Sequence, residues 1–484
     1  MKRLFKDIGI YGLGNIFNKG VNLLLLPLFT AYLTPVDYGI QSLLSFMMLL
    51  LIPFTNLGIG TSFGICYVDK EIEQAKAKTV WTSFFLLLGV SVFFAALTIT
   101  FSKPLSGLLF SNSGYSYLLV LTALTFIFNT LLFPFNAYLQ FESRALTFVL
   151  ISCGSAIFNV VINCYLVMRL SWGIDGLVWG GLWANLLQFT LLYLAIFKKV
   201  PVKLSKRVLQ SLLQHGIPMI SGFFFLFFIQ NSWRYILEHF TSMAALGIFS
   251  VGYNIGCVSL LFVSSLISSW APYFLRFAEK QEETREHFSK IYSYYYFFAG
   301  SLALCFFLYS KLVVELFTAQ PFHSCWIVVG WIALGHLASG GYYLYLPGVY
   351  FAKNVKLVNI SLLTSTCVTV AVTALATLYF GMLGTAIAFF IGQFSLSFAQ
   401  QMVNGYWSLY TVPHESPRLV KFICLLSVGI TYSYIPRNFV FIEEFLFATF
   451  YLAIHLLLTC KLLDAEEKGR LFKFVGLSRR ARGY

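Results

Sequence analysis

Four polar residues near the N-terminus interrupt a long apolar stretch. Asn15, Asn18, Lys19 and Asn22 have the spacing that places side chains on one face of a helix. A charged side chain near the middle of a bilayer costs roughly 2.5–3.5 kcal/mol. A membrane helix that keeps such a charge needs a polar cavity for the side chain to face. We therefore interpret these residues as part of the wall of a polar cavity.

A second group of polar residues lies in the other half of the chain, where Arg234 is followed one turn later by Glu238. In one interpretation, Arg234 is a second cationic group in the cavity wall, opposite Lys19. In the other, Arg234 extends to the outer membrane interface and pairs with Glu238 four residues later. The sequence leaves both open.

Amide side chains recur at helical spacing within other apolar runs. Asn159 belongs to one such stripe and Gln393 to another. Hydrogen bonding between neighbouring helices explains a single stripe. Several stripes together favour a hydrated, amide-rich interior, and neutral hydrogen bonds of this kind suit sugars.

Few ionisable groups could couple transport to an ion gradient. His336 lies in a glycine-rich stretch, and histidine titrates near neutral pH, although a neutral, packed histidine fits as well. Glu142 and Glu238 are the carboxylate candidates, and the gradient could be one of protons or sodium. The sequence contains no nucleophile–base set, phosphate loop or metal-ligand cluster. We expect a transporter rather than an enzyme, with no catalytic residue, metal or other cofactor.

The composition is that of a membrane protein. Of 484 residues, 58% are hydrophobic and 11% charged, and the mean hydropathy is +0.78. Soluble domains are about 25% charged. The net charge of +14 resides on short loops rather than on a hydrophilic domain, so we expect no nucleic-acid partner. The nine cysteines form no CxxC pair and are expected to pack as small hydrophobic residues.

A membrane-spanning helix needs about 20 apolar residues, and about fourteen runs meet this length. The thirteenth run is short, and only a short break separates the eleventh run from the twelfth. A total of twelve or thirteen membrane spans therefore also remains open. The runs cover residues 9–33, 40–63, 79–101, 115–138, 148–168, 174–197, 213–233, 244–272, 291–310, 324–347, 357–379, 382–403, 420–435 and 440–460.

The distribution of the 33 lysines and arginines sets the orientation. With the N-terminus in the cytoplasm, nearly all of them fall on the inner side, as positive-inside topology requires. Lys19 is the one basic residue assigned to neither side. We therefore predict an even span count with both termini cytoplasmic. The outer segments keep only Lys103, Arg169, Arg234, Lys311 and Arg437.

The chain also repeats itself. A segment ending in Gly39-Ile40 opens the second run, and one ending in Gly247-Ile248 opens the eighth. An even number of runs separates the two copies, so they have the same orientation and form a parallel repeat. We predict two lobes of six helices each, residues 1–200 and 201–405. Residues 406–484 would add two further membrane helices and a basic cytoplasmic tail.

Two local stretches carry a resemblance to a known family. Residues 33–43, LTPVDYGIQSL, and 56–62, NLGIGTS, resemble the N-terminal signature of polysaccharide biosynthesis exporters. These are the Wzx-type O-antigen flippases of the multidrug/oligosaccharidyl-lipid/polysaccharide (MOP) superfamily. Residues 246–250, LGIFS, resemble the matching element of their second lobe. Length, span number, duplication and the basic ends extend the likeness over nearly the whole chain.

The resemblance implies a V-shaped, two-lobe bundle similar to the MATE exporters. It also implies a role in O-antigen or lipopolysaccharide biosynthesis. Such proteins move an undecaprenyl-pyrophosphate-linked oligosaccharide to the outer leaflet of the bacterial inner membrane by alternating access. Lys19 stands where the related lipid II flippases have an arginine, and lysine lacks arginine's bidentate fork. In this interpretation Lys19 and Arg234 face the pyrophosphate. The sugars contact Asn15, Asn18, Asn22, Asn159 and Gln393.

Three alternatives remain open. A lipid II-type flippase differs only in its sugar lipid, and a MATE-like drug exporter would favour an acidic cavity. A membrane enzyme of polysaccharide assembly would need a large outer loop with catalytic residues, and every predicted outer loop is short. Expected partners are the lipid-linked oligosaccharide, membrane lipids, and the polymerase and chain-length proteins of the same pathway.

Overall fold

A computed structural model of the chain describes residues 25–462, except positions 70–71, 111, 278–280, 353, 355, 408–409, 412–415 and 436–440. This described part consists of helices, helical turns and short loops, with no β-strand. Asn15, Asn18, Lys19 and Asn22 lie outside the described residues, as do most of the first predicted span and the basic tail.

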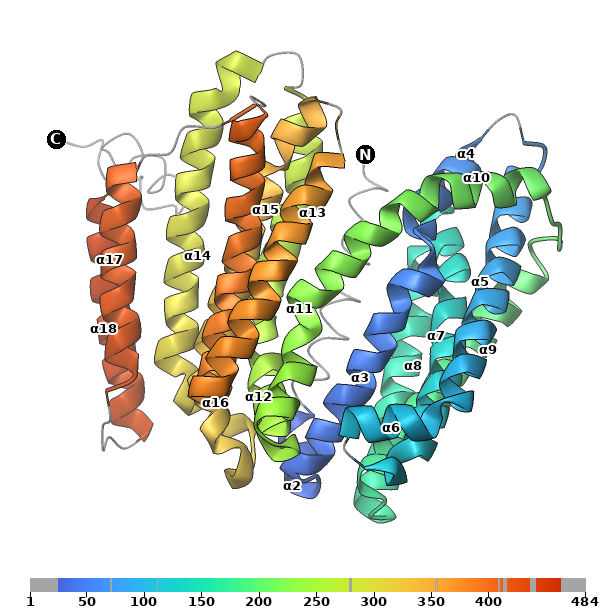
Figure 1. Cartoon of the computed structure of the whole chain (residues 1–484), viewed down its shortest axis with the longest axis horizontal. Coiled ribbons are helices and arrows are strands. Elements are labelled where there is room, and N and C mark those ends of the chain that lie inside the picture. Colours follow the sequence, from blue (N-terminus) through green and yellow to red (C-terminus); the bar gives the residue numbers. More distant parts are fainter. Residues whose placement is uncertain are drawn as a thin grey trace, which may run out of the picture. The chain divides into compact units, whose positions relative to one another are not determined.

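The helices follow one another through short connections (Figure 1). Their bounds are α2 Leu26–Tyr32, α3 Pro35–Asn56, α4 Ile59–Val68, α5 Ala75–Thr100, α6 Ser102–Phe110, α7 Ser116–Phe141, α8 Ala145–Cys164, α9 Gly173–Phe197, α10 Lys206–Gly216, α11 Ile220–Phe240, α12 Met243–Gly256, α13 Leu260–Leu275, α14 Gln281–Phe317, α15 Trp326–Phe351, α16 Lys356–Tyr406, α17 Ser416–Ser433 and α18 Phe441–Lys461.

The helices confirm the predicted multi-pass, all-helical fold. Within the described residues, 11 helical segments are long and apolar enough to cross a membrane. The 51-residue α16 contains two of the predicted spans, because its backbone leaves the helical conformation at Gly381 (φ 53°). α17 coincides with the weak thirteenth run. With the first run, of which the structure describes only the end from residue 25 on, these helices account for about fourteen spans of membrane length.

The sequence around residue 34 explains how α3 begins. The backbone N–H of Thr34 donates to the Asp37 carboxylate at 2.8 Å, and the N–H of Asp37 donates to the Thr34 hydroxyl at 3.2 Å. This reciprocal capping box satisfies two helix-end donors, and Pro35 at the first helical position has no N–H to leave unpaired. The start of α3, and with it the register of Gly39, is thereby fixed locally.

The chain divides into two compact units. The first comprises the chain up to Val251 together with Phe317–Phe322 and Thr373–Thr385, and the second comprises Gly252–Leu316, His323–Val372 and Ala386 onward. These units follow contacts rather than the repeat. The lobe boundaries at residues 200 and 405 therefore stay predictions.

Aromatic side chains form the core of the first unit, where α5, α7 and α9 lie side by side (Figure 1). Trp81 on α5 is only 2% exposed. Its ring contacts Phe84, Phe135 and Tyr193, and its indole N–H donates to the Val200 carbonyl at 3.0 Å. The cluster ties the helix bundle to the chain that follows α9.

The second unit has its own aromatic core, built by α13, α14 and α15. Trp270 packs edge-to-face on Phe288 and Tyr292. The Tyr292 hydroxyl donates to the Leu344 carbonyl, and the Tyr295 hydroxyl donates to that of Leu337 at 2.5 Å. Tyrosines thus satisfy their polar ends on the backbone of α15 while their rings fill the core.

Candidate functional site

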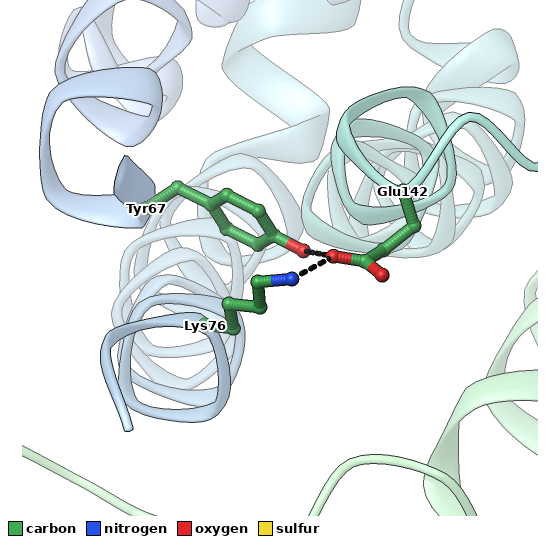
Figure 2. A network of polar contacts seen from close by, with 3 residues as sticks. All are labelled: Tyr67, Lys76 and Glu142. Atoms are coloured by element: carbon green, nitrogen blue, oxygen red, sulfur yellow. Dashed lines mark hydrogen bonds and ion pairs between the residues drawn. The ribbon is translucent and has the colours of Figure 1, made fainter. Parts of the chain in front are cut away.

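A three-residue polar network lies at one end of the first unit (Figure 2). Glu142, directly after α7, accepts a hydrogen bond from the Tyr67 hydroxyl at 2.8 Å. The Lys76 ammonium lies 2.6 Å from the same carboxylate oxygen. Tyr67 is near the end of α4 and Lys76 is in the first turn of α5. One carboxylate therefore joins three helix ends.

The network also fixes the charge of Glu142. Hydrogen bonds from the Lys76 ammonium and then the Tyr67 hydroxyl hold the pKa of the Glu142 carboxyl below its ordinary value. The carboxylate therefore stays ionised at neutral pH. The structure thus places Glu142, a candidate coupling residue, in an ion pair with Lys76.

An open groove of about 810 Å³ adjoins this network. It is lined by Tyr67, Val68, Asp69, Gln74, Ala75, Lys76, Ala77, Phe141, Glu142, Pro201 and Lys203. These residues come from three segments that the charge distribution assigns to the cytoplasmic side. The structure brings the three segments to one end of the unit, as helices of one bundle with that topology require.

Breaking the Lys76–Glu142 pair is expected to have a small effect on stability. Lys76 is exposed, and exposed ion pairs typically contribute about 0.2–1 kcal/mol. Because the pKa of Glu142 is lowered, this contribution is present above the ordinary carboxyl pKa and is lost as the pH falls through the lowered value. A double-mutant cycle of Lys76→Ala and Glu142→Gln, followed by chemical unfolding at neutral and acidic pH, measures it. A coupling energy that persists in acid would contradict this assignment.

Arg234 lies in α11, which packs along α3 in the same unit. Its guanidinium donates to the Ser42 hydroxyl at 2.7 Å and lies 4.4 Å from the centre of the Trp233 ring. Glu238 follows one turn later and is half-buried. The guanidinium thus bridges α11 and α3, a contact that the sequence alone did not indicate.

Asn159 participates in packing between α8 and α9. Its amide donates to the Gly180 carbonyl at 3.5 Å and accepts from the Asn163 amide at 3.0 Å. A Cβ at Gly180 would overlap the Asn163 side chain, so the glycine makes room for the amides. A sugar would have to compete with both hydrogen bonds, of which the one to Gly180 joins α8 to α9 and the one from Asn163 lies within α8.

Gln393 lies deep in the second unit on α16. It is 2% exposed, and its amide nitrogen has no hydrogen-bond partner within the described part of the chain. Two turns later Gln400 accepts from Ser361 at 2.8 Å and donates to Asn404 at 3.1 Å. Asn404 in turn donates to the Tyr345 carbonyl at 2.9 Å. The polar stripe that begins at Gln393 therefore extends along α16 to Asn404.

His336 faces a thiol inside the second unit. It is 4% exposed, and its Nε2 lies 3.3 Å from the Cys257 sulfur. The rings of Tyr253 and Phe389 approach it edge-on, with centroids at 5.6 Å and 5.0 Å. Cys257 opens the short 3₁₀ turn between α12 and α13. The histidine thus sits beside a break in a membrane-length helix, where sequence reasoning had found no partner for it.

The second unit also holds an apolar groove of about 450 Å³. Apolar side chains from α14, α15, α16 and α17 line most of it, and its aromatic members include Trp331, Phe390, Phe394 and Phe422. Tyr296 and Gln401 supply polar atoms. A groove of this composition suits an apolar chain whose polar end reaches hydroxyl and amide groups.

Comparison with known proteins identifies the family. The family model described as "Polysaccharide biosynthesis protein" matches residues 30–327, more than half of the chain. The chain belongs to this polysaccharide biosynthesis family. The family resemblance carried by residues 33–43 and 56–62 is thereby confirmed. No match was found among curated proteins.

Solved structures of transporters share the fold of this family member. The lipid II flippase MurJ, in an inward closed conformation, gives a TM-score of 0.71 at 13% identity, covering 96% of this chain and 99% of that chain. An inward-facing multidrug resistance MATE transporter of the MOP superfamily gives a TM-score of 0.65 at 16% identity, and the match covers 84% of this chain and 97% of that chain. A Vibrio cholerae MATE transporter gives a TM-score of 0.58 at 14% identity, and the match covers 84% of this chain and 96% of that chain. The MATE-like fold is confirmed.

Proposed function

We propose that this chain is a flippase. It moves an undecaprenyl-pyrophosphate-linked oligosaccharide, the repeat unit of O-antigen or a related surface polysaccharide, from the cytoplasmic to the periplasmic leaflet. The observation that carries this proposal is the polysaccharide biosynthesis family match on a chain whose fold resembles MurJ and the MATE transporters. A polysaccharide pathway that assembles its units on a lipid requires a step of this kind.

The roles of individual residues follow from their chemistry. In the proposal, Lys19 and Arg234 neutralise the pyrophosphate, since a charge pair in a partly desolvated cavity is stronger than in bulk water. Asn15, Asn18, Asn22, Asn159 and Gln393 contact the sugars. The apolar groove of the second unit offers a place for the lipid chain. Affinity must remain modest, because the cargo has to leave.

For coupling, we propose a proton carried by His336. An ionisable residue inside a membrane span is by default a candidate functional group. The Nε2 of His336 lies 3.3 Å from the Cys257 sulfur, beside the short turn between α12 and α13. Glu142 is already paired with Lys76, which makes it a poorer proton carrier. A sodium-coupled cycle, with Glu238 as the carboxylate, is the competing scheme.

The proposed location is the bacterial inner membrane, with both termini in the cytoplasm. The polymerase and chain-length proteins of the same pathway are the expected partners.

Removal of the gene tests this proposal. We expect a lipid-linked oligosaccharide to accumulate in the inner leaflet while surface polysaccharide disappears. We expect expression of the 484-residue chain to restore the surface polysaccharide. Accumulation of lipid II instead would identify a lipid II flippase. Loss of drug efflux without lipid accumulation would favour a MATE-like exporter. Accumulation of single, unpolymerised lipid-linked repeat units in the outer leaflet would favour a polymerising enzyme. Each of these three results would overturn the proposal.

A further inference from the structure

Two glycines that mark the internal repeat lie against each other in the structure. Gly39 is in the second turn of α3 and Gly247 in the second turn of α12. A Cβ on Gly247 would overlap the Pro35 carbonyl oxygen and come within 2.9 Å of the Gly39 backbone nitrogen. A Cβ on Gly39 would overlap the Met243 carbonyl oxygen and lie 2.8 Å from Met243 Cγ. The two helix ends therefore touch backbone to backbone.

The residues on the two sides of this contact are equivalent positions of the internal repeat. The spacing from Gly39 to Gly247 equals that from Pro35 to Met243, so the four residues are two pairs of repeat equivalents. Gly39 meets Met243, and Gly247 meets Pro35. A reciprocal pattern of this kind is what a two-fold axis through an interface produces. The repeat axis therefore passes through this crossing, at the end of α3 and α12 that the charge distribution assigns to the outside.

Two further contacts join the predicted lobes at the same end. The Ala319 backbone N–H donates to the Thr30 hydroxyl at 3.1 Å. The Tyr38 and Phe322 rings meet edge-to-face with centroids 5.1 Å apart. The segments Phe317–Phe322 and Thr373–Thr385 belong to the first compact unit, although the helices around them belong to the second. Both segments are outer segments of the second lobe in the predicted topology.

We propose that these contacts form the outer closure of the transport path, and that it must open for the cargo to leave. This inference rests on the proposed function, because a closure matters only if something passes. Its residues are Gly39 and Gly247 at the crossing, with Thr30, Tyr38, Ala319 and Phe322 beside it. In an alternating-access cycle the closure holds the outer side shut while the cargo site faces inward.

The chemistry of the crossing suits a contact that breaks and re-forms. Glycines let two backbones approach closely, so no large side chain interlocks the helices at the crossing itself. Beside the crossing, opening has to separate the edge-to-face pair of Tyr38 and Phe322. The capping box of Thr34 and Asp37 fixes where α3 begins and so holds Gly39 in register with Met243. The LTPVDYG motif is thus accounted for as a device that positions the crossing.

A reversible disulfide tests whether the closure opens. In a variant with the native cysteines replaced, Thr30→Cys and Ala319→Cys place two thiols where a hydrogen bond now joins the residues. We expect oxidation to abolish restoration of surface polysaccharide and a reductant to restore it. The matched control is Asn129→Cys with Asn185→Cys, whose amides lie 3.2 Å apart on α7 and α9 within one predicted lobe. This control should work in both redox states.

Full transport by the oxidised, cross-linked Thr30→Cys/Ala319→Cys protein would overturn the inference, since the outer ends would then never need to separate. This failure is distinct from a failure of the proposed function. The latter appears in the gene-removal strain as the absence of accumulated lipid-linked oligosaccharide, whatever the redox state of the variant.

A glycine series provides a second measurement that needs no cross-link. Gly39→Ala and Gly247→Ala each add a methyl group where the backbone of the other helix lies, and overpacking of this kind is not readily absorbed. We expect transport to fall by at least about tenfold in each at normal protein levels, since overpacking at the crossing prevents its closure. Gly89→Ala and Gly181→Ala meet open space and should retain activity. Full activity of Gly247→Ala would contradict the assignment.

Discussion

Replacing Lys19 with alanine is expected to reduce surface polysaccharide at least about tenfold, because a charge-assisted contact contributes about 1.5–3 kcal/mol. The expectation rests on sequence alone, since Lys19 lies outside the described residues. The lysine lies inside an apolar run with three asparagines on the same helix face. Placing a charged lysine inside a membrane span costs free energy, so such a residue is expected to have a function, here the binding of an anionic cargo. The measurement is surface polysaccharide in a gene-removal strain that expresses the variant.

Two controls separate charge from structure at this position. Lys19→Arg keeps the positive charge and should retain most of the activity. Lys103→Ala removes an exposed lysine of α6 on the predicted outer side and should have no effect. The cationic-site hypothesis is wrong if Lys19→Ala reaches normal levels in the membrane and restores full polysaccharide.

Replacing Trp81 with alanine should produce the largest loss of stability among single core substitutions in the first unit. Truncation of a buried tryptophan typically costs about 3–5 kcal/mol. Trp81 is packed against Phe84, Phe135 and Tyr193, and its indole N–H bonds the Val200 carbonyl. Its loss would leave both a cavity and an unpaired carbonyl. The measurement is the free energy of unfolding of the purified protein in detergent.

The matched control is Phe93→Ala on the same helix. Phe93 is 63% exposed in the structure, on a surface that lipid or detergent would cover. Its truncation should change the free energy of unfolding far less than that of Trp81. Equal losses for the two variants would contradict the packing described for α5.

The membrane helices could be predicted from sequence because length and hydropathy alone nearly decide them. Runs of about 20 apolar residues leave few other structures possible in a bilayer. Short helices and helix breaks depend on packing between segments, which the hydropathy of a single run does not indicate. The sequence did not reveal α10, whose short amphipathic stretch buries Val208 and Leu212. It also did not reveal the break between α3 and α4, where Leu57 and Gly58 adopt left-handed conformations.

For the candidate site, the sequence indicated which polar residues are involved but not which residues they contact. His336, Glu142 and Arg234 were found as polar groups in or beside apolar runs. Their partners Cys257, Lys76 and Ser42 are far away in sequence, and no periodicity connects them. The repeat did indicate that Gly39 and Gly247 are equivalent. It did not indicate that they touch, because equivalence in sequence fixes symmetry but not the position of the axis.

The most direct test of the proposed function is translocation by the purified protein. The protein is reconstituted into liposomes that contain the undecaprenyl-pyrophosphate-linked oligosaccharide, and a membrane-impermeant oxidant then reports which sugars face outward. We predict that nearly all of the lipid-linked sugar becomes accessible in vesicles with the protein, and only the outer-leaflet share in vesicles without it. Equal accessibility in both preparations, with correctly inserted protein and an imposed proton gradient, would contradict the account.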